Sequence, residues 1–126
     1  MMEATIYQQY KTQSLETLSG GELVVKLFDE ASKQIGIAIF LTNQHDAARA
    51  YDCIAKAQKI ITTLEFSLDM NYSISIELRN LYQFLFKALS ESIVNRDVEL
   101  MKRLLYMVDE LKVAFRQADK ITRAGK

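Results

Sequence analysis

The sequence predicts an all-α protein: a single domain over residues 1–126 that folds as an antiparallel, up-down four-helix bundle with a short, loosely docked N-terminal segment. Three observations lead to this prediction. Four stretches of the chain carry apolar residues three or four positions apart, which is the spacing of one face of an α-helix. Short polar segments separate these stretches, so consecutive helices are expected to run antiparallel. The chain has no proline, and no stretch alternates apolar and polar residues as a strand would.

The N-terminal segment, residues 1–18, differs from the rest of the chain. It places Ile6, Tyr7 and Tyr10 among glutamine, threonine and serine. This pattern is too sparse for a core helix, yet too apolar for a fully solvated tail. Two interpretations stay open at this point, which are a segment that docks loosely on the bundle and a frayed terminus.

The first two helices have recognisable start signals. The SGGE sequence from Ser19 to Glu22 is typical of a capping box, in which the serine hydroxyl accepts a hydrogen bond from the glutamate N–H. It predicts a helix over about 20–42. Asp46 follows a polar turn and can cap a second helix over 46–68. One face of that helix is expected to hold its core residues, which are Ala47, Tyr51, Ile54, Ala57, Ile61, Leu64 and Leu68.

The third and fourth helices are predicted from similar signals. Ser73 or Ser75 can cap a helix over 74–94, and Asp97 can cap a helix over 97–121. The third helix has a broad apolar face that consists of Leu78, Leu81, Tyr82, Leu85, Ala88, Leu89 and Ile93. The fourth helix has the most regular series, which is Met101, Leu104, Val108, Leu111, Phe115 and Ala118. Four such faces are expected to close onto one core.

The composition argues against several classes of partner. Sixteen basic and sixteen acidic residues cancel, so no overall field attracts nucleic acid or anionic lipid. The chain has neither a secretory leader nor a run of about 18 apolar residues, so neither secretion nor membrane insertion is expected. The single cysteine, Cys53, excludes an internal disulfide and fits a reducing compartment. We therefore expect a cytoplasmic protein that does not bind nucleic acid and does not insert into a membrane, although specific charged patches stay open.

The residues that catalysis or metal binding needs are not arranged for it. A di-iron site in a helical bundle takes a Glu-x-x-His pair from each of two helices, and the one histidine, His45, lies in a predicted turn. Cys53 has no histidine neighbour and lies at the edge of an apolar face, where an inert packed thiol is expected. No acidic residue falls within an apolar face, where burial could prepare it for acid or base catalysis. We expect no enzyme, no cofactor and no metal.

Several large apolar residues fall outside the predicted core faces. They are Val25, Phe40, Ile60, Phe84, Tyr106 and Val113. The third helix stands out, because Phe84 and Phe86 widen its apolar arc to roughly 200°, beyond the ~100° that bundle packing requires. Such a surplus is typical of a groove that receives an amphipathic helix, and equally of a homodimer interface. The pattern alone does not separate these two uses.

A set of short segments spread along nearly the whole chain carries a family resemblance. They are Tyr7 and Tyr10, Gly21-Glu22-Leu23 with Leu27-Phe28-Asp29, Lys56-Ala57-Gln58 with Ile60-Ile61 and Leu64, Ser67-Leu68-Asp69, and Leu81-Tyr82. In this order they resemble the flagellar secretion chaperone family FliS. The sequence departs from the family pattern at Gly20, where proline is usual, and at Phe115, where tryptophan is common. The second change keeps an aromatic ring in the core series.

The resemblance implies a chaperone that binds the disordered C-terminal region of flagellin, prevents premature polymerisation and assists delivery to the flagellar type III export gate. The family's N-terminal segment lies over part of an apolar groove, which implies that Tyr7 and Tyr10 form a lid that the client displaces. Ile60, Phe84 and Phe86 are then the candidate groove residues. Flagellar regulators are a further class of partner that the resemblance leaves open.

Two other classes of function stay open beside the chaperone. A helical oligomerisation or adaptor module would use the surplus apolar arc to pair with itself, and it predicts a stable dimer that does not bind flagellin. An enzyme or metal carrier built on a bundle would need ligands that this chain lacks. A metal analysis of the purified protein would test that third possibility.

Overall fold

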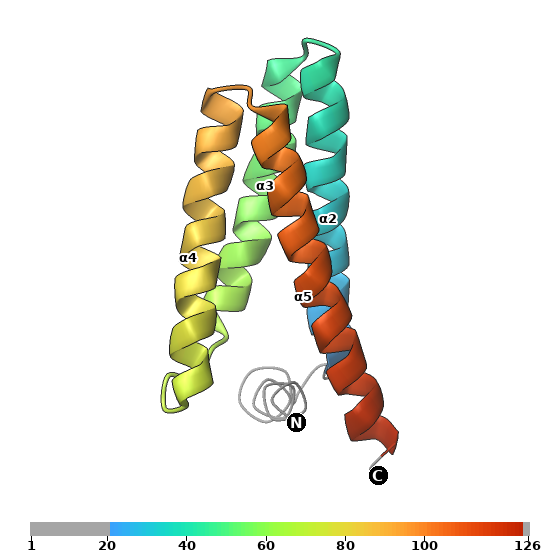
Figure 1. The fold of residues 1–126 in the computed structure, drawn as a ribbon, viewed down its shortest axis with the longest axis vertical. Coiled ribbons are helices and arrows are strands. Elements are labelled where there is room, and N and C mark those ends of the chain that lie inside the picture. The colour runs from blue at the N-terminus through green and yellow to red at the C-terminus, as the bar shows by residue number, and fades with distance from the viewer. Residues whose placement is uncertain (1–20, 125–126) are drawn as a thin grey trace.

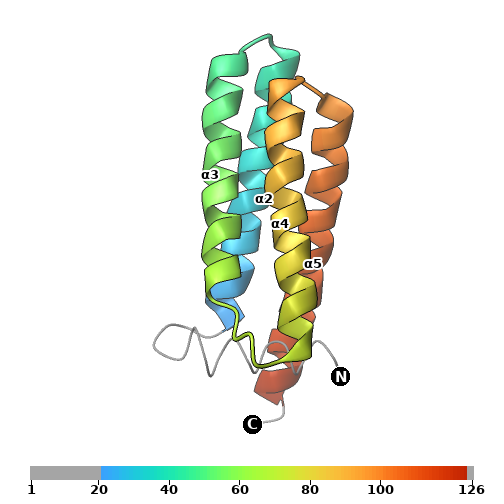
Figure 2. The same cartoon turned by 90° about the vertical axis from the view of Figure 1, so that its left-hand side faces the viewer.

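The described part of the chain consists of four α-helices joined by short connections. A computed structural model describes the backbone of residues 21–124 and the side chains of residues 22–118. The helices are α2 (Gly21–Asn43), α3 (Ala47–Phe66), α4 (Ser73–Val94) and α5 (Val98–Ala124). Each runs antiparallel to the one before it (Figure 1, Figure 2). The predicted four-helix bundle is confirmed, whereas the N-terminal segment 1–18 and the capping serine, Ser19, lie outside the described residues.

One continuous core joins all four helices. Phe28 of α2 is fully buried, and its ring lies against two other buried aromatic rings. The distance between ring centroids is 5.3 Å to Phe115 of α5 and 6.4 Å to Tyr82 of α4. Burial of a phenylalanine side chain stabilises a fold by roughly 1.5–3 kcal/mol. This aromatic cluster therefore ties α2, α4 and α5 together at one level of the bundle.

The predicted core position of Tyr51 is wrong. Its side chain is 60% exposed, and the buried residues of α3 are Ala50, Ile54, Ala57, Ile61 and Leu64. A step of three residues falls short of a full helical turn, and a step of four exceeds it. Tyr51 consequently lies about 100° around the helix axis from the centre of the buried face. Ala50 takes the core position instead.

Two aspartates begin the helices that follow the turns at one end of the bundle. The backbone N–H of Arg49 donates to Asp46 Oδ1 at 3.2 Å, and the backbone N–H of Leu100 donates to Asp97 Oδ1 at 3.0 Å. Each bond satisfies one of the N–H groups that a helix start leaves without an intrahelical partner. The predicted caps of α3 and α5 are confirmed.

The same two turns end the preceding helices in the same way. His45 has φ 61° and Arg96 has φ 51°, which is the left-handed conformation that stops a helix. The N–H of the aspartate that follows then donates to a carbonyl of the last helical turn, at 2.9 Å for Asp46 and 2.8 Å for Asp97. One aspartate thus closes one helix with its backbone and opens the next with its side chain.

The connection between α3 and α4 is built differently. The predicted serine caps are wrong, because Ser73 is already helical and Ser75 is buried within the first turn of α4. The residue before the helix is Tyr72, in an extended conformation and without a side-chain cap. Its carbonyl accepts from the N–H of Ser75 at 3.1 Å, and Asp69 accepts from the N–H of Asn71 at 3.0 Å. Backbone and Asx-turn bonds hold this connection.

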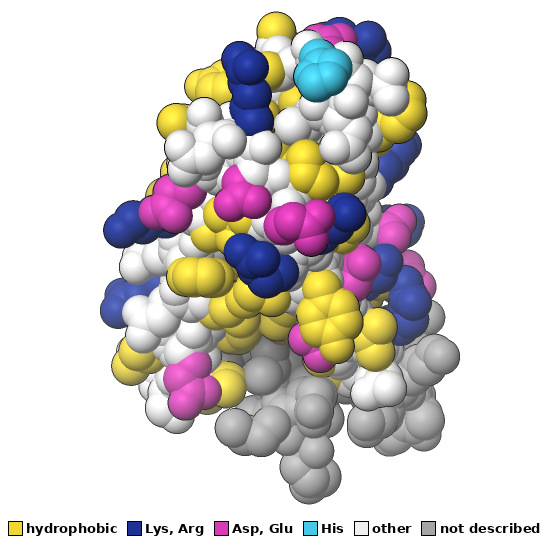
Figure 3. All heavy atoms as spheres, turned by 45° about the horizontal axis from the view of Figure 1, so that its top comes forward, with side chains coloured by type: hydrophobic (Ala, Val, Ile, Leu, Met, Phe, Trp, Pro, Cys, Tyr) yellow, Lys and Arg dark blue, Asp and Glu magenta, His cyan; other side chains and the backbone are white. Residues whose placement is uncertain are grey.

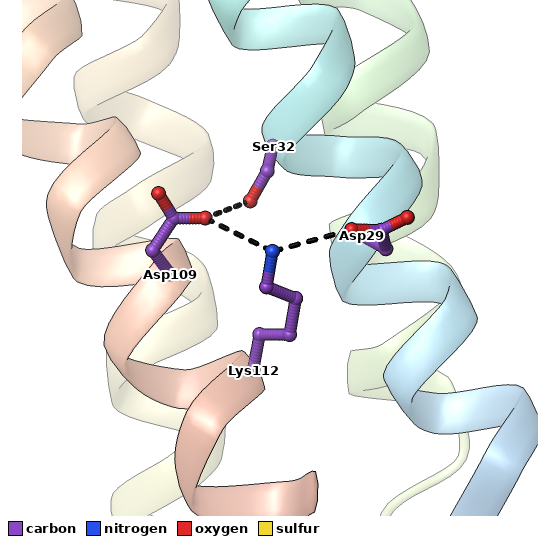
Figure 4. A network of polar contacts seen from close by, with 4 residues as sticks. All are labelled: Asp29, Ser32, Asp109 and Lys112. Carbon is purple, nitrogen blue, oxygen red and sulfur yellow. Dashed lines mark hydrogen bonds and ion pairs between the residues drawn. The ribbon is translucent and has the colours of Figure 1, made fainter.

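A polar network joins α2 to α5 (Figure 4). The Ser32 hydroxyl donates to Asp109, and Lys112 Nζ lies 3.2 Å from Asp29 Oδ1 and 3.6 Å from Asp109 Oδ1. The Lys112 side chain is only 18% exposed, so its methylene groups pack against the bundle while its charged end reaches both carboxylates.

α4 and α5 have the least extensive contact among the neighbouring helix pairs. They approach each other at their shared turn, and their axes diverge away from it (Figure 1). Among the side chains of residues 22–118, no hydrogen bond or ion pair joins these two helices. This flank of the bundle is therefore held by apolar contacts alone within the described side chains.

Candidate functional site

The flank of α4 that faces α3 is identified by two glutamines. Gln58 Nε2 of α3 donates to the Phe86 carbonyl at 2.9 Å and to Ser90 Oγ at 2.7 Å. Gln83 of α4 donates to Glu65 of α3 at 2.9 Å. Because Gln83 and Ser90 both point to α3, one side of α4 is assigned to the α3–α4 boundary.

Phe86 lies on this α3-facing flank. It precedes Ser90 by four residues, and positions four apart share one face of a helix. Its side chain is 42% exposed, so it is neither a core residue nor a fully free one. The aromatic ring stands at the outer edge of the α3–α4 boundary.

Phe84 lies on the opposite flank of α4, which faces α5. Its helical neighbours at three and four residues are Leu81, which is half-buried against the core, and Ala88, which is buried. Phe84 itself is 52% exposed. A phenylalanine at this exposure, next to an apolar seam, leaves a large apolar area in contact with water.

The flank of α5 that faces α4 is also apolar. Asp109 and Lys112 point to α2, so the other side of α5, which carries Met107 and Leu111, faces α4. Both residues are partly buried against the core. We name the set Leu81, Phe84, Met107 and Leu111 the α4–α5 surface. Figure 3 shows hydrophobic side chains gathered between these two helices, with charged side chains around them.

Ile60 lies on a third side of the bundle. It is half-buried and lines a shallow, open depression between α2 and α3. The rest of the lining consists of Glu30, Gln34, Lys56, Lys59 and Thr63. The predicted groove residues Ile60, Phe84 and Phe86 therefore lie at three different helix boundaries and do not form one continuous site, while Tyr7 and Tyr10 lie outside the described residues.

The structure exposes further apolar side chains that the sequence pattern did not single out. They include Tyr51, Phe66, Tyr72, Ile76 and Val94. Phe66 and Tyr72 flank the α3–α4 connection, and a residue at a helix end loses the neighbouring turn that would cover it. Gln58 was also missed as a structural contact, although it lies in the quoted Lys56-Ala57-Gln58 segment. Its position next to the buried Ala57 is the signal that could have indicated a half-buried polar bridge.

Several kinds of site are not found in the described residues. No group of three or more histidine, cysteine, aspartate or glutamate side chains is arranged to hold a metal ion there. No helix within residues 21–124 is sufficiently long and apolar to cross a bilayer. Cys53 is half-buried and packs against the core. The candidate site is the partly exposed apolar surface, which comprises Leu81 and Phe84 of α4 with Met107 and Leu111 of α5.

Comparison with known proteins gives two matches. A model of the family described as flagellar protein FliS matches residues 3–122. A protein of Bacillus subtilis (strain 168), the flagellar secretion chaperone FliS, is 27% identical over 112 residues, which cover 89% of this chain and 84% of that protein. The family match covers α2, α3 and α4 in full and α5 as far as residue 122.

Proposed function

The chain belongs to the FliS family of flagellar proteins, and we propose that it is a flagellar secretion chaperone. The client is the disordered C-terminal region of a flagellin, which the chaperone keeps from polymerising in the cytoplasm and assists toward the flagellar type III export apparatus. The name of the Bacillus subtilis relative supports the general role. The resemblance of the quoted segments supports the finer assignment of client and destination.

The observation that carries the proposal is the α4–α5 surface. A helix of the client can lay its apolar face on Phe84, Leu81, Met107 and Leu111, because these side chains are only partly covered by the bundle itself. Burying a half-exposed phenylalanine contributes roughly 1 kcal/mol or more. The weak contact between α4 and α5 leaves room for a partner to add apolar contacts at this boundary.

Phe86, Ile60 and the N-terminal tyrosines have secondary roles in this proposal. Phe86 lies across α4 from Phe84, so a client that extends over α4 would reach both rings. Ile60 is farther away, at the α2–α3 boundary, and we place it at the end of such a path. Tyr7 and Tyr10 form a lid that the client displaces, an assignment that rests on the family resemblance alone.

The mechanism requires no catalysis and no cofactor. A disordered client that folds on the bundle spends several kcal/mol of interaction energy on its own ordering, which keeps the complex reversible. Bound client is removed from the pool of monomers that can polymerise, so protection follows from mass action. Release then needs only a competing partner, which we take to be the export gate.

Calorimetric titration tests the proposal directly. The protein is titrated with a peptide that covers the C-terminal region of a flagellin from the source organism, and far-ultraviolet circular dichroism of the mixture is recorded. We expect one-to-one binding, a gain in helix beyond the sum of the two components, and a negative heat-capacity change. Absence of both heat and helix gain would contradict the client assignment. A tight dimer in the same samples would then favour the adaptor module.

Matched variants locate the surface. Phe84→Asp is expected to weaken peptide binding by at least about tenfold, because it places a charge in the buried contact. Phe40→Asp is the control, since Phe40 is exposed on α2, away from α4. Phe86→Asp is expected to have an intermediate effect. Equal binding by the Phe84 and Phe40 variants would exclude the α4–α5 surface as the principal contact, provided that circular dichroism shows both variants folded.

A further inference from the structure

Two polar bridges cross the α3–α4 boundary, and they have the same spacing on both helices. Gln58 Nε2 donates to the Phe86 carbonyl at 2.9 Å and to Ser90 Oγ at 2.7 Å. Gln83 donates to Glu65 at 2.9 Å. The two α3 residues of these bridges are seven positions apart, and so are Gln83 and Ser90 on α4. Because α3 and α4 are antiparallel (Figure 1), both bridges belong to one alignment of α4 on α3.

The apolar core of α4 does not fix this alignment by itself. Its buried face repeats a large apolar side chain every three or four residues, at Leu78, Tyr82, Leu85 and Leu89. A shift of α4 by one helical turn would therefore again place a large apolar side chain near each core position of α3. Polar contacts specify register where repeated apolar side chains do not, because a donor that moves by one turn loses its acceptor.

Gln58 binds the backbone of α4 as well as a side chain. A helical carbonyl accepts from the N–H four residues later and keeps a second lone pair, and the Phe86 carbonyl also accepts from Gln58. A backbone oxygen has no side-chain rotation that could absorb a displacement, so this bond fixes both the rotation of α4 about its axis and its position along that axis. The bridge from Gln83 to Glu65 joins two long side chains at the surface and constrains the rotation less.

The rotation of α4 determines where the Phe84 ring points. Phe84 lies on the flank of α4 opposite to Ser90, and a rotation of the helix would carry the ring away from its place beside α5. The contact between α4 and α5 is the least extensive among the neighbouring helices, so it offers little resistance to such a rotation. We infer that Gln58 is a positioning residue for client binding, because it aligns α4 so that Phe84 completes the α4–α5 surface.

Fluorine NMR tests the positioning on the full chain without any client, whereas the effect on binding rests on the proposed function. The protein is labelled with 4-fluorophenylalanine, and the Phe84 resonance is identified by its absence from Phe84→Ala. Gln58→Met keeps the length of the side chain and loses the donor, and Gln58→Glu keeps its shape but presents a carboxylate to the Phe86 carbonyl at neutral pH. Both variants are expected to shift or broaden the Phe84 resonance, although Gln58 lies on the other side of α4.

A matched control and an internal reference accompany this measurement. Gln34→Met removes a glutamine of α2 that donates to Glu30 of the same helix at 2.7 Å, so it changes no contact between helices and is expected to leave the Phe84 resonance in place. The Phe40 resonance reports on α2 and is expected to stay unchanged in every Gln58 variant. Circular dichroism checks that each variant is folded. A general loosening of the bundle would instead move both resonances.

Titration with the flagellin C-terminal peptide is the second readout. Gln58→Met and Gln58→Glu are expected to weaken binding by about fivefold to tenfold, and Ser90→Ala, which removes one of two acceptors, by about threefold or less. In a Phe84→Ala background, Gln58→Met is expected to cause no further loss, because Gln58 acts through that ring.

The two measurements separate this inference from the proposed function. A Phe84 resonance that stays unchanged in both Gln58 variants would overturn the inference, whether or not the peptide binds. An equal loss of binding from Gln58→Met with and without the Phe84 ring would also overturn it, because Gln58 would then act independently of Phe84. A displaced Phe84 resonance in a protein that binds no peptide would support the alignment of α4 by Gln58 and overturn the client assignment instead.

Discussion

The two sides of α5 show two ways in which a helix is attached to this bundle. Toward α2, Lys112 and Asp109 form a polar network with Asp29 and Ser32, and the ring of Phe115 lies on Phe28. Toward α4, the described side chains provide apolar contact only, and less of it. Polar pairs fix one arrangement of two helices, because each donor needs its own acceptor. Partly exposed apolar side chains have no such requirement and can pack against any apolar partner. The α2–α5 boundary is therefore a structural contact, and the α4–α5 boundary is suited to binding a partner.

The largest test of this contrast compares two phenylalanines. Phe28→Ala is expected to lower the free energy of unfolding by about 3–5 kcal/mol, because it leaves a cavity where three helices meet. Phe84→Ala is expected to lower it by no more than about 1 kcal/mol, because the ring is half-exposed. Urea unfolding followed by circular dichroism measures both values. Similar losses for the two variants would mean that Phe84 is a structural residue and that the contrast is wrong.

A smaller effect is expected at the turn that links α4 to α5. Asp97→Ala removes the side-chain cap of α5 and is expected to cost about 1 kcal/mol in the free energy of unfolding. Asp97→Asn keeps an acceptor oxygen and is expected to cost much less. Hydrogen exchange of the α4 amides should rise in the alanine variant if this turn is a main attachment of α4. Unchanged exchange in α4 would show that its contact with α3 holds it without the cap.

The smallest effect is expected in the α2–α5 network. Lys112→Met keeps most of the packing of the side chain and removes its charge. It is expected to cost less than about 1 kcal/mol, because the carboxylates of Asp29 and Asp109 are 67% and 47% exposed and therefore well solvated. The loss should shrink at high salt. Lys102→Met is the control, since its pair with Glu99 is fully at the surface. A large, salt-independent loss for the Lys112 variant would instead indicate that packing of its methylene groups dominates.

Local signals in the sequence were sufficient for the helix starts after the two turns. Asp46 and Asp97 act within three residues of themselves, so a pattern of neighbouring residues contains the whole interaction. Tyr51 could not be placed in the same way, because a three-or-four spacing also fits residues about 100° from the buried face, and only the neighbouring helices decide which side is covered. The serines near α4 failed as caps because the extended Tyr72 takes that position.

The candidate site was less predictable from the sequence than the helix starts. The pattern identified Phe84 and Phe86 as surplus to the core, and both are indeed exposed. Their two-residue spacing places the rings on opposite flanks of α4. The pattern could not show which helix each flank faces, or that Ile60 lies at another boundary, because those contacts depend on which helix stands beside which. The exposure of Phe84 and Phe86 was thus predictable, whereas the division of Ile60, Phe84 and Phe86 among three boundaries required the three-dimensional arrangement.

The unequal construction of the two ends of the bundle has a practical consequence for labelling and fusion experiments. At one end, each turn is closed by a left-handed residue and by an aspartate that serves two helices at once. An insertion there would separate the aspartate from either the helix that its backbone closes or the helix that its side chain caps. At the other end, residues 67–72 connect α3 to α4 through short-range backbone and Asx-turn bonds. A fluorophore attachment site or a short epitope is best introduced into this connection.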